Sequence, residues 1–254
     1  MKMKKIFAAL LALMCFASLV ACGESEQFGL FDSDGESLFE NAQDEITADA
    51  ARQLITQMAT EGGLDVTGSK APAVAGGMPL PTDKLVNGLM AQYSSCSVTT
   101  TYYNEEGTQE ETKVLRGEEL MAMLSQNTLS PFSDFTVKYV TAFPELINYM
   151  EAQNQAFTQS EAYIFAPVKS LFSYYTDADG NLVVHINNFE NLKLSEGMAG
   201  GVNSEYRQQI ELVYDETNKL ISWQASMGVV TKFPQGDLAN GCVMKADFAW
   251  EEKN

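Results

Sequence analysis

Residues 171–189 read LFSYYTDADGNLVVHINNF, two alternating apolar runs separated by the turn sequence DADGN. Asp and Asn tolerate left-handed backbone and Gly has no Cβ, so this turn joins two antiparallel strands into a hairpin. A second hairpin has the same form, because residues 206–214 and 220–227 flank a polar turn at 215–218. The hairpins follow one another without the intervening helices that a parallel sheet requires, so the sequence predicts an antiparallel sheet.

Further alternating runs lie on both sides of these hairpins and raise the expected number of strands to about eight. These runs are residues 96–103, 112–115, 134–141 and 242–250. Helical spacing of apolar residues predicts three or four helices between them. The helices are expected over 37–60 with a break near Thr47, from residue 83 to about 90, over 117–125 and over 143–150.

The predicted fold class is α+β: a curved, mostly antiparallel sheet with helices packed on one face, like half of a barrel. We expect residues 37–254 to form one domain, with a flexible Gly- and Pro-rich loop at 62–81. Such a long loop leaves two interpretations for the helix before it. The helix either packs on the sheet or forms a separate appendage, and its amphipathic pattern favours packing.

The composition excludes several classes of function. The chain has 254 residues, with 16 Lys and Arg against 34 Asp and Glu, and a net charge of −18. This acidity argues against nucleic-acid binding, which needs a basic surface. The single His excludes a metal site with several His ligands and argues against a Ser-His-Asp triad. We expect no cofactor and no metal ion.

The N-terminus has the pattern of a processing signal. Lys2, Lys4 and Lys5 precede 15 uncharged residues at 6–20. As a helix this run would span about 22 Å, which is short for a hydrocarbon core of about 30 Å. Residues 1–21 therefore read as a signal peptide.

The end of this run, Leu19-Val20-Ala21-Cys22, resembles the lipobox of bacterial lipoprotein precursors. The resemblance implies that a diacylglycerol is attached to the Cys22 thiol and that the chain is cut just before it. Residues 22–36 would then be an acidic tether, and the side-chain charge would become −21 because three lysines are removed. The implied location is the outer face of a bacterial membrane, with either type of envelope left open.

Acidic residues suggest two kinds of chemistry that simpler interpretations also explain. The turns at 32–36 and 177–181 resemble calcium loops, but Gly occupies the fourth position and no Glu follows at the twelfth. Glu105, Glu106, Glu110 and Glu111 could supply paired carboxylates for an acid-dependent hydrolase, although solvent-exposed charges on a hairpin are the simpler interpretation. His185 alternates with apolar neighbours and is expected on the surface.

Cys96 and Cys242 are the two cysteines that remain once the signal peptide is removed and Cys22 carries lipid. Both lie on the apolar side of predicted strands. In an oxidising compartment they could form a disulfide between the first and the last long strand. The alternative is that both are small buried apolar residues.

Two classes of function remain for the domain. A curved sheet with aromatic and Met side chains on its inner face could enclose an apolar ligand or lipid, near Trp223 and Trp250. In its tether, size and order of elements, the chain is similar to half-barrel lipoproteins that carry lipids or lipoproteins. The alternative is a surface interaction protein that binds another protein or a glycan through its loops or sheet face. Both are non-enzymatic.

The lipobox resemblance leads to the first prediction. Replacing Cys22 with Ala removes the thiol that would receive the lipid, so the precursor should stay uncleaved or the protein should be released. Labelling cells with radioactive palmitate measures this directly. Equal labelling of the Cys22→Ala protein and its parent would show that Cys22 carries no lipid.

Overall fold

The computed structural model describes residues 41–68, 79–104, 107–126, 141–159, 169–193, 203–233 and 236–254, and every structural statement below concerns these residues. Residues 1–40, which include Cys22 and the segments expected to be a signal peptide and a tether, lie outside them, as do Glu105 and Glu106. The strand predicted at 134–141 also lies outside, apart from Thr141, which forms an isolated antiparallel bridge with Lys219.

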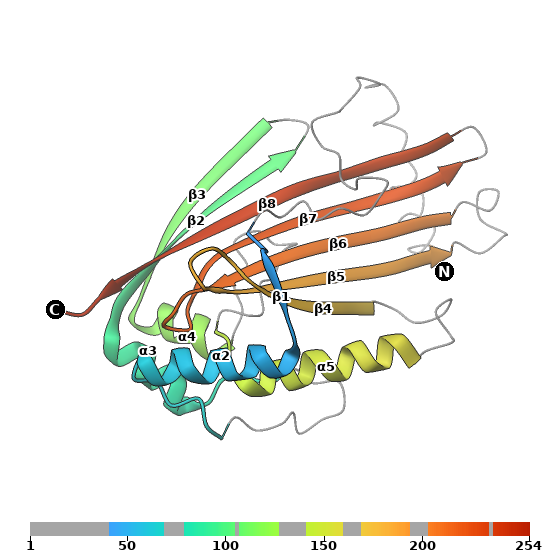
Figure 1. The fold of residues 1–254 in the computed structure, drawn as a ribbon. Coiled ribbons are helices and arrows are strands. Elements are labelled where there is room, and N and C mark those ends of the chain that lie inside the picture. The colour runs from blue at the N-terminus through green and yellow to red at the C-terminus, as the bar shows by residue number, and fades with distance from the viewer. Residues whose placement is uncertain are drawn as a thin grey trace, which may run out of the picture.

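Eight described strands form one open antiparallel sheet in the order β1-β4-β5-β6-β7-β8-β2-β3 (Figure 1). The α+β fold class predicted from the sequence is confirmed. The strands are β1 (Asp44–Ile46), β2 (Tyr93–Asn104), β3 (Gly107–Arg116), β4 (Lys169–Thr176), β5 (Leu182–Lys193), β6 (Asn203–Tyr214), β7 (Leu220–Phe233) and β8 (Gly236–Glu252). The hairpin β2–β3 precedes β4 in the chain but pairs with β8, so an early part of the domain closes on its last strand.

The helices of the described chain lie on one face of this sheet (Figure 1). They are α2 (Ala48–Glu61), α3 (Asp83–Gln92), α4 (Gly117–Gln126) and α5 (Pro144–Gln159). Thr47 and Thr82 cap α2 and α3, because each hydroxyl accepts a hydrogen bond from a backbone N–H three residues later. None of these helices is both long and apolar enough to cross a membrane.

The N-terminal part of the predicted first helix is wrong. Residues 44–46 form β1, which pairs with Tyr174–Thr176 of β4. Thr47 has extended backbone angles, φ −76° and ψ 160°, so the helix begins only after it. As a strand, residues 44–46 form backbone hydrogen bonds with the edge of β4, which they could not form as a helical turn. The local sequence pattern does not show that β4 lies close to these residues. The expected break near Thr47 and the end before Gly62 are confirmed.

The helix α2 packs on the sheet and is not an appendage. Ala51, Ile55, Met58 and Ala59 are its buried residues, and they belong to the core cluster between helices and sheet. The sheet forms the other side of this core, because every second side chain along its strands points toward the helices. On β8, for example, Met244, Ala246 and Phe248 are buried while Asp247 is exposed.

The two hairpin turns share one geometry. Asp177 and Asp215 each begin a five-residue turn, and each carboxylate accepts hydrogen bonds from backbone N–H groups two and four residues later. The fourth residue is left-handed in both turns, Gly180 with φ 83° and Asn218 with φ 67°. Turn formation therefore accounts for the acidic residues that resembled a calcium loop at 177–181.

Gly180 allows this geometry to be tested on its own, because a Cβ there would meet no atom within 4 Å. Gly180→Ala should lower the free energy of unfolding by about 1 kcal/mol through backbone strain alone. Gly180→Asn should cost less, because Asn tolerates left-handed backbone. Urea unfolding of both variants measures the difference. An Ala variant as stable as the Asn variant would contradict the strain argument.

Candidate functional site

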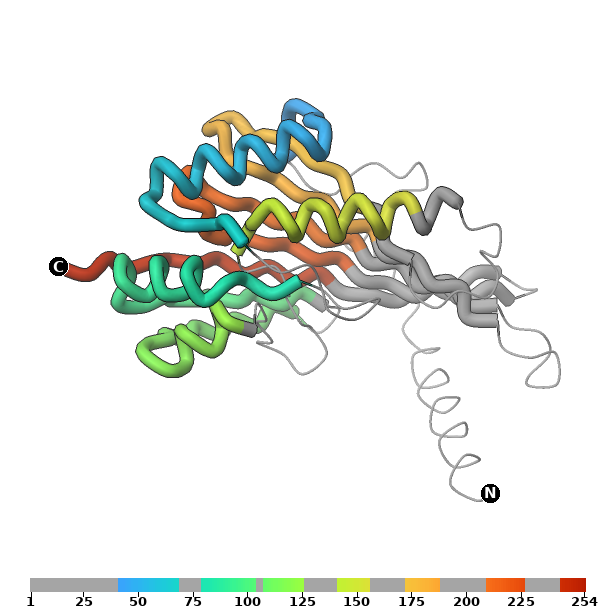
Figure 2. The backbone as a smooth tube through the Cα atoms, turned by 90° about the horizontal axis from the view of Figure 1, so that it is seen from below, coloured from blue at the N-terminus to red at the C-terminus, as the bar shows by residue number. Residues whose placement is uncertain are grey.

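The four helices cover the sheet as two pairs rather than as one layer (Figure 2). The helix α2 packs against α5 over β4 and β5, whereas α3 packs against α4 over β2 and β3. In the described residues no helix of one pair packs extensively against a helix of the other. We call the line between the pairs the seam. The middle strands β6, β7 and β8 lie beneath it.

Apolar side chains of the sheet form the floor of the seam. Trp223 of β7 lies between Leu212 of β6 and Ala246 of β8, and Ala225 lies opposite Met244. All five are buried. Side chains of both helix pairs join them in one core cluster, including Leu85 and Leu89 of α3 and Leu146 and Met150 of α5. The seam is therefore closed by side chains and not by contact between helix backbones.

The two tryptophans face the helices, as the alternation along their strands predicts. Trp223 is only 1% exposed, so its indole is a core side chain. A ligand could reach it only if the helix pairs separated. Trp250 is half-buried at the end of β8, where its Nε1 donates to the Leu220 carbonyl at 3.0 Å. Its ring packs edge-on against Tyr93, with the ring centres 5.6 Å apart.

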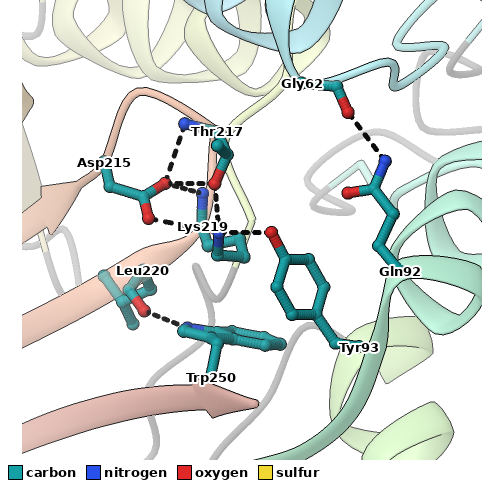
Figure 3. A network of polar contacts seen from close by, with 8 residues as sticks. All are labelled: Gly62, Gln92, Tyr93, Asp215, Thr217, Lys219, Leu220 and Trp250. Carbon is teal, nitrogen blue, oxygen red and sulfur yellow. Dashed lines mark hydrogen bonds and ion pairs between the residues drawn. The ribbon is translucent and has the colours of Figure 1, made fainter. Parts of the chain in front are cut away.

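A buried polar network lies beside Trp250, at the turn between β6 and β7 (Figure 3). The Lys219 ammonium donates to the Tyr93 hydroxyl at 2.7 Å and to the Thr217 hydroxyl, and it lies 3.2 Å from Asp215 Oδ2. It is also 4.3 Å from the centre of the Tyr93 ring. Lys219 is 5% exposed. The sequence analysis missed this residue, since a Lys at the end of a hairpin turn normally points to solvent.

The network joins the ends of several elements. Next to Lys219, the Asn218 amide donates to the Ala142 carbonyl just before α5. Gln92 at the end of α3 donates to the Gly62 carbonyl at the end of α2, at 2.7 Å. Tyr93 begins β2. The ends of α2, α3 and α5 are therefore tied together at this turn.

The chemistry of the network is structural. The ammonium of Lys219 has three protons and three oxygen partners, so no proton is left for a substrate. The nearby Cys96 thiol is fully buried, and burial raises its pKa to about 12 against the opposing effect of Lys219. A thiol with such a pKa stays protonated at neutral pH and is a poor nucleophile. Neither group is arranged for nucleophilic catalysis.

The proposed disulfide between Cys96 and Cys242 is wrong. Cys96 is a free thiol opposite Trp250 in the β2–β8 ladder. Cys242 lies eight residues before Trp250 on β8, which is about 26 Å along the strand. A disulfide requires Cα atoms within about 7 Å. The two strands are neighbours, as expected, but the register keeps the cysteines apart.

His185 differs from the prediction of a surface side chain. It lies on the face of the sheet opposite the helices, as alternation predicts, but it is only 7% exposed. Its Nε2 is 2.8 Å from Glu211 Oε2, and Glu211 Oε1 accepts from the Asn41 amide at 2.7 Å. Glu211 was not singled out from the sequence. The pair holds the first described residue of the domain against this face.

Other kinds of site to consider in the described residues are a metal site, a pair of catalytic carboxylates and a pocket beside the tryptophans. They contain no group of three or more His, Cys, Asp or Glu side chains that could hold a metal ion. Glu110 and Glu111 are exposed on β3. An open groove of about 610 Å³ runs along the outer side of α2, with Arg52, Thr56 and Pro144 in its wall, and neither Trp223 nor Trp250 lines it.

The buried ammonium leads to a prediction about stability. Lys219→Met keeps the length of the side chain but leaves the Tyr93 hydroxyl and Asp215 without their cation, so it should lower the free energy of unfolding by about 3 kcal/mol. Lys245 provides the control, because its ion pair with Asp247 is half exposed. Lys245→Met should cost less than about 1 kcal/mol. Equal losses in urea unfolding would contradict a structural role for the network.

Comparison of the chain with protein-family models, with curated proteins and with solved structures finds no match. The function therefore has to be argued from the residues themselves. The seam over Trp223 and the network at Lys219 are the two arrangements on which that argument rests.

Proposed function

We propose that the chain is a lipoprotein of the bacterial cell envelope, anchored through Cys22, whose domain is a non-enzymatic binding module for an apolar ligand such as a lipid chain. The ligand would lie in the seam, against the floor formed by Trp223, Ala225, Met244 and Ala246. The anchoring rests on the lipobox at residues 19–22. The binding rests on one observation, that in the described residues the two helix pairs do not pack extensively on each other above the apolar middle strands of the sheet.

The cover over the seam has the properties that a reversible binding site needs. Helices that pack on the sheet but not on one another can separate without breaking hydrogen bonds within either pair. Met58, Met123, Met150 and Met244 lie in the core cluster. Met side chains are unbranched and flexible, so they can repack around ligands of different shape.

The energies are of the right size. Each buried CH₂ group contributes about 0.8 kcal/mol, so ten carbons of an acyl chain contribute about 8 kcal/mol. This is comparable with the whole stability of an ordinary domain, about 5–15 kcal/mol. An acyl chain could therefore offset the free-energy cost of separating the helix pairs. The acidic domain, with a net charge of −18 in the whole chain, favours a ligand whose head group is not an anion.

The two tryptophans allow a direct test, because they are the only ones in the chain. In the Cys22→Ala background, which has no acyl chains of its own, Trp250→Phe leaves Trp223 as the single indole, and Trp223→Phe leaves Trp250. A bromine-substituted fatty alcohol quenches indoles on contact. We expect saturable quenching of Trp223 and weaker quenching of Trp250, measured by fluorescence titration.

The control is acrylamide, a water-soluble quencher, which should quench the half-buried Trp250 more than Trp223. Failure of the brominated alcohol to quench Trp223 at any concentration, with the fold intact by circular dichroism, would contradict an apolar site in the seam.

A further inference from the structure

The two edges of the sheet differ in how far their backbone hydrogen-bonding groups are covered. At one edge, β1 is only three residues long and covers Tyr174–Thr176 of β4. Beyond it, the Asn154 side chain of α5 pairs with the backbone of Phe172, accepting from its N–H at 2.7 Å and donating to its carbonyl at 2.8 Å. The amide thus takes the place of a neighbouring strand. Short edge strands and covering helices are the usual protection against pairing with another chain.

The helix that carries Asn154 is held firmly at this edge. The Tyr174 hydroxyl donates to Glu151 of α5 at 3.0 Å. Burial, together with the negative charge of Glu151, raises the pKa of Tyr174 above its ordinary value, so the phenol keeps its proton and remains a donor. The β4 edge is therefore closed to a further strand.

In the described part of the chain, the opposite edge has no short covering strand and no helix side chain that pairs with its backbone as Asn154 does. Among the described residues, β3 has a hydrogen-bonded neighbour, β2, on one side only. It is ten residues long, contains no Pro, and pairs with β2 from Ser95 to Asn104 without a bulge. Every residue of β3 except Leu115 is exposed. A long, regular and uncovered edge strand can accept a strand from another chain.

The side chains at this edge combine carboxylates with exposed apolar groups. Glu110 and Glu111 lie on β3, and Glu118 and Glu119 begin α4, which follows β3 directly and packs against it. Three large apolar side chains are exposed in the described residues. Two of them, Val114 at 39% and Met121 at 45%, belong to β3 and α4.

These charges decide which occupant fits. Residues 107–119 carry four carboxylates against two basic residues, Lys113 and Arg116, and Lys113 already lies 4.0 Å from Glu119. A second copy of this chain would bring the same acidic edge and the same negative net charge, so pairing between copies is disfavoured. A basic segment would gain from the same carboxylates that repel a copy.

We propose that β3 is a docking edge for an extended, basic segment of another protein, which adds to the sheet as a ninth strand. Backbone hydrogen bonds to β3 supply the pairing. Because side chains alternate along a strand, Glu110 and Val114 lie on the face away from the helices. Glu111 and Leu115 lie on the face toward α4, which carries Met121. The segment therefore needs Lys or Arg on both of its faces, with apolar side chains beside Val114 and Met121. This proposal does not depend on an apolar ligand in the seam, which lies over the middle strands.

The probe is a labelled ten-residue peptide in which pairs of adjacent Lys residues alternate with Val and Thr, so that both faces of the added strand carry Lys. It is compared with the same peptide carrying Glu in place of Lys. The processed chain in mild nonionic detergent is titrated and fluorescence anisotropy gives the affinity. We expect the Lys peptide alone to bind, with about tenfold weaker binding after Glu110→Gln and Glu111→Gln together. The matched control, Asp44→Asn with Glu45→Gln on β1, removes the same charge at the closed edge and should change the affinity less than about twofold.

Hydrogen exchange distinguishes strand addition from simple charge attraction. Bound peptide should slow amide exchange in residues 107–116 and leave residues 169–176 unchanged. Binding without this protection, or an equal loss of affinity in both double variants, would overturn the proposal. So would dimerisation of the chain through β3 without peptide, because a second copy would then be the occupant.

Discussion

One face of the sheet is apolar from β4 across the middle strands to β2, and the domain depends on how that face is kept from water. The four helices of the described residues cover it as two separate pairs. The pair α2 and α5 lies over β4 and β5, and the pair α3 and α4 lies over β2 and β3. The middle strands are left to side chains, among which Trp223 is the largest. This division gives the domain both its solid core and a line along which it could open.

The network at Lys219 holds the two helix pairs together at one end of the seam. A buried ammonium is costly unless each of its protons has a partner, and here Tyr93, Thr217 and Asp215 supply them. Those partners come from the start of β2 and from the turn before β7. Because the ends of α2, α3 and α5 meet at the same turn, separation of the helix pairs is restrained at this end and would have to begin at the other.

Most of the fold could be predicted from local sequence patterns. Asp177 and Asp215 predicted both hairpins because the turn chemistry is contained within five residues, and alternation correctly assigned Trp223 and His185 to opposite faces. Facts that depend on contacts between distant segments could not be predicted. Residues 44–46 form a strand by pairing with the edge of β4. His185 is buried where Glu211 bonds its ring and the Tyr175 ring packs against it. The register of β2 on β8 separates Cys96, which is buried as expected, from Cys242.

The two edges of the sheet differ in how close they lie to the N-terminal end of the described chain. The described chain begins at Asn41, which is bound to Glu211, and passes directly into β1 at the closed edge. The open strand β3 is seven strand positions away, about 34 Å at the usual spacing between strands. In a protein held at Cys22, the tether would therefore reach the domain at the edge that admits no further strand. The uncovered edge would lie at the other end of the sheet, where a partner could approach without competing with the anchor.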